Sequence, residues 1–414
     1  MYISVVGLGV EGQQATISLL KRGYNVYSSD INRKIDLSLL DEIDLNEYDS
    51  NIDLEIGSHN LDKIYKSDAV AVSPSLFNKE ICRNIIQRGI FLSDVFTKHR
   101  SIKTIAVTGT NGKTTTSHMI YSILQNAGYK CLIGGNGGGG FSGYIDLLMD
   151  ANSDDYDYMV IEVCDMTLEF CKYVFDIDIT VVTNIGYDHM DVHKSIEHYT
   201  QEVIEFIKDK PSIINSNDEN LLKTTSYPSK CILFDTYDGK LNLFGKFNLH
   251  NADAAYKTSQ FLGVKEETIK ESLEKFESVE GRTIKLSYNN NDVVIGKTDN
   301  VDALKVVLKE EKFDIVVIGT ARANETFRHQ ILDYIKKYDA DTLIIFPGLE
   351  DTTVEYAQYL NNLGYNKDVL ILKNIEDILR YINNYKNKNI FIGGNGQKKI
   401  TQISTIIQEE NECS

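Results

Sequence analysis

The sequence is poor in residues that stiffen or cross-link a chain: it has no tryptophan, four prolines and six cysteines in 414 residues. The cysteines show neither a CxxC pair nor the spacing of a disulfide framework, so we expect reduced core thiols, as in the cytoplasm. They are Cys82, Cys131, Cys164, Cys171, Cys231 and Cys413. No apolar run approaches the roughly 18 residues of a membrane-spanning helix, and the chain starts in a predicted strand rather than a signal peptide. The sequence therefore predicts a cytoplasmic protein without membrane insertion.

Basic residues are also in deficit. Lysine and arginine number 43 against 60 aspartates and glutamates, which gives a formal net charge of −17. This balance argues against a nucleic-acid-binding surface, because phosphate contacts need clustered basic side chains. A hydrophobic share of 42% and a charged share of 25% are normal for a globular protein. The length predicts two or three domains.

What the sequence does contain is a nucleotide-type loop at residues 104–116. An apolar strand runs into the glycine turn Gly109–Gly112, and a lysine followed by hydroxyl residues opens an amphipathic helix. Glycines let backbone N–H groups turn inward, and the helix N-terminus adds partial positive charge. Lys113 can then reach terminal phosphates, and Thr114 can offer a hydroxyl to Mg²⁺. The common pattern has a further glycine where this chain has Val107. We predict a nucleoside triphosphate site; a plain glycine turn is the alternative.

A second glycine motif stands at the start of the chain. The strand Tyr2–Val6 leads into Gly7-Leu-Gly-Val-Glu-Gly12 and a helix, and a second strand ends at Asp30. This order is the dinucleotide-type fingerprint, in which phosphates lie on the helix N-terminus. NAD is its familiar ligand, but the second nucleotide loop later in the chain argues against a dehydrogenase. A Rossmann-like domain whose glycines serve only close packing is the other alternative.

Strands and helices go on alternating through the first hundred or so residues. We expect strands at 68–75, ending in a Ser-Pro turn, and at 89–94, with a helix between them. Such alternation predicts a parallel sheet with crossover helices. The polar and basic segment 97–103 marks the first domain boundary.

Acidic and imidazole side chains follow the strands of the middle segment. Glu162 ends a buried-type strand, where a carboxylate beside the phosphate loop is placed to hold Mg²⁺. Asp165 is either a further ligand or a helix N-cap. Another strand ends at Asn184 and is followed by Asp188-His-Met-Asp191. Because imidazole can join carboxylates in a mixed metal site, His189 is a candidate ligand.

Several of these motifs together resemble those of the Mur ligase family, which joins amino acids to carboxylates during cell-wall precursor synthesis. The strongest are Thr-Gly-Thr-Asn-Gly-Lys-Thr-Thr at 108–115 and Asn-x-x-x-Asp-His-Met-Asp at 184–191. Further matches are the Gly-x-Phe-Asn-x-x-Asn segment at 245–251, the Phe-…-Gly-Arg pair at 276–282, and Lys-x-x-Asn at 297–300. The resemblance covers the whole chain and is weakest in the last third.

The resemblance implies a ligase that uses ATP and Mg²⁺. In the family, ATP phosphorylates a carboxylate to an acyl phosphate, an amine attacks, and ADP and phosphate leave. The implied catalytic residues are Lys113, Glu162 and His189, and the implied metal ligands are Thr114, Glu162 and His189. The implied ATP site comprises Gly109, Thr110, Asn111, Gly112, Lys113, Thr114, Thr115, Asn248, Asn251 and Arg282.

In this family the N-terminal domain holds the UDP part of a precursor rather than NAD. The residues that would bind it here are Gly7, Gly9, Val10, Glu11, Gly12, Asp30, Ser73 and Asn136. Asn136 lies in the glycine run 134–140, which is a loop close to a ligand or, alternatively, a flexible connection. The incoming amino acid would meet Lys297, Asn300 and Arg322. For Lys297 and Arg322, a solvated surface position is the alternative.

The chain departs from the family at two places. Many members carry a lysine in the helix at about 195–208, and its carbamate bridges to the second metal. This chain has Val203 there; the branch that adds alanine to muramate also lacks the lysine. In the amino-acid loop, Asp299 stands where the family has threonine, which argues against D-glutamate as the added residue.

We therefore expect an α/β protein of three domains. An N-terminal Rossmann-like UDP-substrate domain spans residues 1–98, a central P-loop ATPase-like parallel sheet spans 99–283, and a C-terminal Rossmann-like domain spans 284–414. The predicted reaction adds an amino acid to a UDP-linked sugar or sugar-peptide, and the protein is expected to be a monomer. A divergent, archaeal pseudomurein-type ligase is the preferred version. The alternatives are a ligase for a tetrapyrrole or folate carboxylate and a non-catalytic nucleotide-binding regulator.

Overall fold

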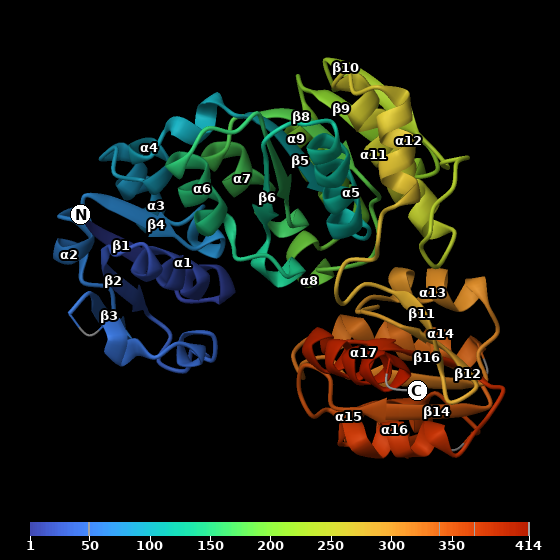
Figure 1. Ribbon diagram of the computed structural model, residues 1–414. Helices are drawn as coiled ribbons and strands as arrows, with labels where there is room; N and C mark the ends of the chain where they lie inside the picture. The colour runs from blue at the N-terminus through green and yellow to red at the C-terminus, as the bar shows by residue number, and fades with distance from the viewer. Residues whose placement is uncertain (49, 339, 368, 413–414) are drawn as a thin grey trace. The chain divides into compact units, whose positions relative to one another are not determined.

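The computed structural model describes residues 1–48, 50–338, 340–367 and 369–412. Within these residues the strands form three separate sheets of four, six and six strands. They are coloured blue, teal to yellow-green, and orange to red in Figure 1. Each sheet lies inside one of the three predicted domain ranges, and the α/β fold class with parallel sheets is confirmed. The domain boundaries themselves stay predictions.

The first sheet has the order β3-β2-β1-β4 and is parallel throughout. Its strands β1 and β4 are almost entirely buried apolar runs, as expected for parallel strands covered on both faces. The strands are β1 (Tyr2–Val6), β2 (Asn25–Asp30), β3 (Ile52–Ile56) and β4 (Ala69–Val72). The helices of this segment are α1 (Val10–Lys21), α2 (Leu61–Tyr65), α3 (Glu80–Gln87) and α4 (Leu92–Val95).

The prediction of a strand at 89–94 is wrong. Only Phe91 pairs there, in an isolated bridge to Val70. The next residue, Leu92, already begins α4, so the chain turns away before a ladder can form. The buried Phe91 and Leu92 supply the apolar pattern that suggested a strand.

The second sheet has the order β10-β9-β8-β5-β7-β6, and all its pairs are parallel. Because β5 lies between β7 and β8, the loops that follow these three strands open next to one another at the carboxyl edge. The strands are β5 (Lys103–Thr108), β6 (Cys131–Gly135), β7 (Tyr158–Glu162), β8 (Ile177–Val182), β9 (Pro211–Asn215) and β10 (Lys230–Phe234). The helices of this part of the chain are α5 (Lys113–Asn126), α6 (Tyr144–Ser153), α7 (Leu168–Val174), α8 (Met190–His193), α9 (Ile196–Ile207), α10 (Glu219–Leu222), α11 (Phe247–Phe261) and α12 (Glu266–Glu274).

The third sheet has the order β11-β12-β16-β13-β14-β15, and only the β11–β12 pair is antiparallel. Alternate residues of β13 belong to two apolar clusters, because successive side chains of a strand point to opposite faces. One cluster includes residues of α13, α14 and α15, and the other includes residues of α16 and α17. The strands are β11 (Ile284–Tyr288), β12 (Asn291–Ile295), β13 (Ile315–Gly319), β14 (Thr342–Phe346), β15 (Val369–Ile371) and β16 (Asn389–Gly394). The helices are α13 (Val301–Glu310), α14 (Gln330–Tyr338), α15 (Thr353–Asn362), α16 (Ile375–Asn383) and α17 (Gln397–Glu412).

The chain divides into two compact units. The first unit contains residues 1–185, 197–235 and 253–272, and it holds the first and second sheets. The second unit contains residues 186–196, 236–252 and 273–414, and it holds the third sheet. Two segments from the middle of the sequence therefore pack with the C-terminal sheet. Among the described residues, no helix has the length and apolarity to cross a membrane.

A close approach of backbone fixes the turn between β1 and α1. A Cβ atom on Gly12 would lie 1.8 Å from the Gly7 carbonyl oxygen, so any side chain there displaces the helix. Gly7 itself has a φ of 88°, in the region that favours glycine. Gly9 has a φ of −62° and nothing within 4 Å of an added Cβ. Packing therefore requires a glycine at position 12. At Gly9 there is space for a side chain, so the N-terminus of α1 is not covered there.

We expect the substitution Gly12→Ala to lower the free energy of unfolding by about 1–3 kcal/mol, the usual cost of overpacking. The matched substitution Gly9→Ala should change it by less than about 0.5 kcal/mol, because its methyl group enters open space. Chemical denaturation of both variants measures the difference. Equal losses in the two variants would contradict the packing role of Gly12.

Candidate functional site

The loop after β5 has the backbone shape of a phosphate cradle. Gly109 and Gly112 have φ values of 125° and 85°, which favour glycine. A Cβ atom on Gly109 would lie 2.3 Å from Thr183 Oγ1, so the loop passes close to the end of β8. Helix α5 begins at Lys113. The N–H groups of its first turn and the positive end of its dipole therefore lie at the loop.

The end of β8 holds this loop in shape. The Thr110 N–H donates to the Asn184 carbonyl oxygen at 3.0 Å, and the Asn111 N–H donates to Asn184 Oδ1 at 2.9 Å. Thr183 Oγ1 in turn donates to the Asn111 carbonyl oxygen at 2.6 Å. These bonds satisfy backbone groups that a tight loop would otherwise leave unpaired. Sequence reasoning missed Thr183, because its role depends on a strand pairing far apart in sequence.

The predicted lysine points into the loop. Lys113 Nζ donates to the carbonyl oxygens of Gly109 at 2.7 Å and Thr110 at 2.9 Å. Both acceptors are neutral, whereas a phosphate oxygen is charged and attracts the ammonium group more strongly. The arrangement suits an ammonium group that turns to an anion bound in the cradle.

A carboxylate and a hydroxyl meet beside the cradle. Thr114 Oγ1 donates to Glu162 Oε2 at 2.5 Å, and Asn136 Nδ2 donates to Glu162 Oε1 at 3.0 Å. Glu162 is 1% exposed. A Cβ atom on Gly139 would lie 2.1 Å from Glu162 Oε1, so the glycine run of residues 134–140 is packed against the carboxylate. The hydroxyl and carboxylate oxygens are the ligand type that Mg²⁺ prefers, and they fit the ion predicted from the sequence.

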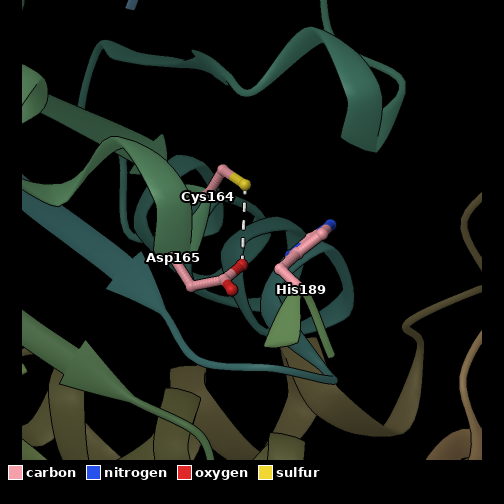
Figure 2. A group of neighbouring side chains, drawn as sticks. All are labelled: Cys164, Asp165 and His189. Carbon is pink, nitrogen blue, oxygen red and sulfur yellow. Dashed lines mark hydrogen bonds between the residues drawn. The ribbon is translucent and has the colours of Figure 1, made fainter. Parts of the chain in front are cut away.

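Asp165 lies three residues beyond Glu162 and is 2% exposed. Figure 2 shows the Cys164 thiol pointing to its carboxylate, to which Cys164 Sγ donates at 3.5 Å. Burial, followed by the neighbouring Asp165 charge, raises the pKa of the Cys164 thiol well above its ordinary value. The N-cap position of α7 is taken by Thr167, so the interpretation of Asp165 as a helix N-cap is wrong.

The predicted histidine stands in a left-handed turn of the second unit. His189 has φ and ψ of 48° and 35° and precedes α8. Its N–H donates to Asp188 Oδ1 at 3.0 Å. Asp188 Oδ2 accepts from Asn300 Nδ2 at 3.3 Å, and Asp188 Oδ1 lies 3.7 Å from Arg328 Nη2. The structure thus ties the histidine turn to the loops of the third sheet.

The remaining candidates for the ATP site also lie in the second unit. Asn248 and Asn251 stand in the first turn of α11, where Asn251 Nδ2 donates to Asn248 Oδ1 at 3.0 Å. Asn248 Nδ2 donates to the Phe244 carbonyl oxygen at 2.8 Å. Arg282 follows α12, and its N–H donates to the Val279 carbonyl oxygen at 3.0 Å.

Comparisons with known proteins find similar proteins over most of the length of this chain. The family model described as Mur ligase middle domain matches residues 107–259. The UDP-N-acetylmuramoylalanine–D-glutamate ligase of Lawsonia intracellularis is 25% identical over 397 residues, covering 89% of this chain and 88% of the relative. The UDP-N-acetylmuramate–L-alanine ligase of Caldanaerobacter subterraneus is 24% identical over 474 residues, covering 99% and 97%. A pseudomurein peptide ligase type C from Methanothermus fervidus has a similar fold, with a TM-score of 0.62, 20% identity and 99% coverage of both chains.

The middle of the chain matches the Mur ligase middle domain, and relatives similar to the chain over most of its length are Mur ligases. The chain is an ATP-dependent ligase that forms carbon–nitrogen bonds. The matched segment begins in β5 and ends in α11, so it contains the cradle, Glu162 and His189.

We expect Val203, from its distance to the His-Met-Asp motif, to stand where many Mur ligases carry a carbamylated lysine. Its side chain is fully buried in α9. The helix therefore offers an apolar group at this position, and the absence of a carbamate there stays a prediction.

The predicted UDP-binding residues surround the turn between β1 and α1. Asp30 Oδ2 accepts from the Leu8 N–H and Asp30 Oδ1 from the Asn32 N–H, both at 2.7 Å, so Asp30 shapes the loop. Ser73 lies beside Gly7, where an added Cβ would meet the Ser73 Cβ at 2.8 Å. Val10 is an exposed residue at the first position of α1. Asn136, by contrast, bonds to Glu162 at the cradle.

Glu11 joins α1 to the glycine-rich loop after β6. Its two carboxylate oxygens accept from the N–H groups of Gly137 at 2.7 Å and Tyr144 at 3.0 Å. Burial raises the pKa of Glu11 to about 7, although both hydrogen bonds favour the charged form. Arg22 continues the same contact between helices, because Arg22 Nη1 lies 2.8 Å from Asp146 Oδ1 on α6.

The predicted amino-acid-binding residues lie after β12 and β13. Lys297 Nζ is 3.2 Å from Asp299 Oδ2, and Asn300 caps α13 by accepting from the Ala303 N–H at 2.9 Å. Arg322 is exposed and pairs with Glu325 at 3.3 Å. The buried arginine of this region is Arg328, whose side chain is 6% exposed.

We expect the free energy of unfolding to depend on pH in a way that reports the raised pKa of Glu11. Its pKa is raised from 4.5 to about 7 on folding. Between these values the folded chain keeps a proton that the unfolded chain has released, so stability falls as pH rises, by about 2–3 kcal/mol. In Glu11→Gln this contribution is absent, and the variant should gain that amount relative to the parent between pH 5 and pH 8.

Denaturation curves at several pH values measure this gain, with the exposed Glu80→Gln as the control. Parallel pH profiles for the parent chain and Glu11→Gln would refute the assignment.

Proposed function

We propose that the chain adds an amino acid to a carboxylate of a UDP-linked sugar or sugar-peptide, with release of ADP and phosphate. The observation that carries the proposal is the contact of Thr114 with the buried Glu162 beside the cradle. It joins a phosphate-binding loop to oxygen ligands for Mg²⁺, as phosphoryl transfer requires. The reaction would take place in the cytoplasm, with the protein as a monomer.

In the proposed reaction, the substrate carboxylate attacks the terminal phosphorus of ATP, and the bond to ADP breaks. The amine of the amino acid then attacks the acyl carbon and loses a proton, and phosphate leaves with one of the carboxylate oxygens. Lys113 and the loop N–H groups would hold the phosphates in line. Thr114 and Glu162 would be ligands of Mg²⁺, and His189 is the further ligand that we propose. The ion would supply positive charge that offsets the charge of the phosphoryl group.

Two features guide the choice of substrates. Val203 separates the chain from members that use a carbamylated lysine. Asp299 separates it from members that add D-glutamate. Similarity over nearly the whole length to a muramate–alanine ligase supports a UDP-linked muramate-type acceptor. We infer a divergent ligase, of the archaeal pseudomurein type.

The alternatives lack support of this kind. Folate-type ligases generally lack the N-terminal domain, whereas this chain carries a complete parallel sheet at β1–β4. A regulator that only binds a nucleotide has no need for Glu162 and Lys113 together. A ligase for a tetrapyrrole carboxylate keeps the same chemistry and differs only in the acceptor.

The test is phosphate release from ATP and Mg²⁺ in the presence of acceptor panels. UDP-N-acetylmuramate, UDP-N-acetylmuramoylalanine and other UDP-sugars are crossed with single amino acids, and tetrapyrrole and folate carboxylates form a separate arm. We expect rapid release with one acceptor–amino acid pair and little with ATP alone, because water must be kept from the acyl phosphate. Release that ignores every pair would contradict the ligase proposal.

Two controls make this assay specific. Lys113→Ala should abolish release while the chain stays folded. Lys103→Ala should not change it, because Lys103 is an exposed residue at the start of β5, at the other end of the strand from the phosphate loop. Added bicarbonate should have no effect, because Val203 cannot form a carbamate. Rescue by bicarbonate would show that another lysine serves.

A further inference from the structure

Arg328 is a buried cation shared by three loops of the second unit. Its guanidinium lies 3.4 Å from Asp299 Oδ2 and 3.4 Å from Glu325 Oε2. Its Nη1 also donates to Asn395 Oδ1 at 3.0 Å. Taking an arginine out of water is costly unless its charge is matched, and the neighbouring carboxylates do this. They raise the pKa of Arg328 above its ordinary value, against the opposing effect of burial.

The position of Arg328 follows from the topology of the third sheet. Asp299 follows β12, Arg328 follows β13, and Asn395 follows β16. These strands are neighbours in the order β12-β16-β13, and all three are parallel to one another. Their carboxyl ends therefore bring the three loops together around one guanidinium.

A fourth group reaches the same cluster from far away in sequence. Residues 186–196 pack with the second unit, and their Tyr187 N–H donates to Asp302 Oδ2 at 3.0 Å. Asp188 contributes its two oxygens, one to Asn300 Nδ2 at 3.3 Å and one to Arg328 Nη2 at 3.7 Å. Asp188 is 6% exposed, so its charge depends on this cation rather than on water.

The oxygen of Asp188 that faces Arg328 also accepts the His189 N–H. His189 needs such support, because a left-handed conformation costs a residue other than glycine about 1–3 kcal/mol. The direction of the imidazole depends on this turn, since the backbone angles of His189 set where its Cβ points.

We propose that Arg328 is a positioning residue: it fixes Asp188, and through Asp188 it fixes the turn that presents His189 to the metal. The inference rests on the proposed function, in which His189 is a metal ligand. Arg328 touches neither the metal nor the substrate in this scheme. Its removal acts through Asp188, so the substitutions Arg328→Gln and Asp188→Asn should affect the same step.

The test is Mn²⁺ binding, followed by electron paramagnetic resonance in the presence of a non-hydrolysable ATP analogue. We expect His189→Ala to remove one Mn²⁺ site. Arg328→Gln and Asp188→Asn should each lower the Mn²⁺ affinity of that site by about 10- to 100-fold, as substitutions of residues that hold metal ligands in place do. The double variant should lose little more than either single one. Arg328→Lys should restore part of the affinity, because it keeps the charge without the planar fork.

Arg380→Gln is the matched control, because Arg380 forms an exposed pair with Asp377 at 3.0 Å on another part of the same unit. It should leave Mn²⁺ affinity unchanged. If Arg328→Gln does not fold, Asp188→Asn carries the test. It removes the charge that faces Arg328, while its amide oxygen can still accept the His189 N–H, so a loss of Mn²⁺ affinity reports the contact with Arg328.

The outcomes separate the two proposals. If His189→Ala leaves Mn²⁺ binding unchanged, the metal role in the proposed function fails. If His189→Ala weakens Mn²⁺ binding but the Arg328 and Asp188 variants bind Mn²⁺ like the parent, the inference is overturned. Arg328 then supports only the fold, whether or not the melting temperature of these variants is lower.

Discussion

The end of strand β8 is the constraint on which the site depends. Thr183 and Asn184 hold the phosphate loop after β5, and Ile185 is held in turn by Asp218, whose Oδ2 accepts its N–H at 2.7 Å. Residues 186–196, which come next, belong to the second unit. A few consecutive residues therefore leave the nucleotide loop and arrive at the histidine turn. The phosphate site and the histidine share one covalent connection, and each end of it is fixed by its own hydrogen bonds.

Three carboxylates with little exposure are stabilised in three different ways. Glu11 accepts two backbone N–H groups, and Asp188 lies beside an arginine. Glu162 accepts from a hydroxyl and an amide, which are neutral donors. Neutral donors do not cancel a buried negative charge, whereas a bound cation does. The donors to Glu11 are neutral too, but burial raises the pKa of Glu11 to about 7, so it can hold a proton. Glu162 lies beside the phosphate loop through its contact with Thr114, where Mg²⁺ would supply the cation.

Sequence patterns predicted the features of this protein that depend on residues close together in the sequence. The glycine turns after β1 and β5 and the alternation that gives three mainly parallel sheets follow from glycine placement and strand–helix order, and the structure contains them. The binding of phosphate by the loop after β5 stays a prediction. The prediction of a strand at 89–94 was wrong because a buried Phe-Leu pair is compatible with either a strand or the start of a helix.

Long-range contacts were beyond such reasoning. Thr183 and Arg328 draw their roles from partners on other strands and loops, and no spacing in the sequence marks them. Arg322 and Arg328 look alike as neighbouring arginines, yet one is exposed and the other is 6% exposed. The roles of the predicted site residues stay predictions, although Thr114 and Glu162 do lie in contact.

The central claim is that a carboxylate oxygen is transferred to phosphorus before the amide bond forms. The direct measurement uses the acceptor selected in the panel, labelled with ¹⁸O in its carboxylate, together with ATP, Mg²⁺ and the amino acid. Mass spectrometry of the released phosphate should find one ¹⁸O atom for each doubly labelled carboxylate consumed. Released phosphate that carries oxygen from water instead, at the same rate as product formation, would contradict the acyl-phosphate account.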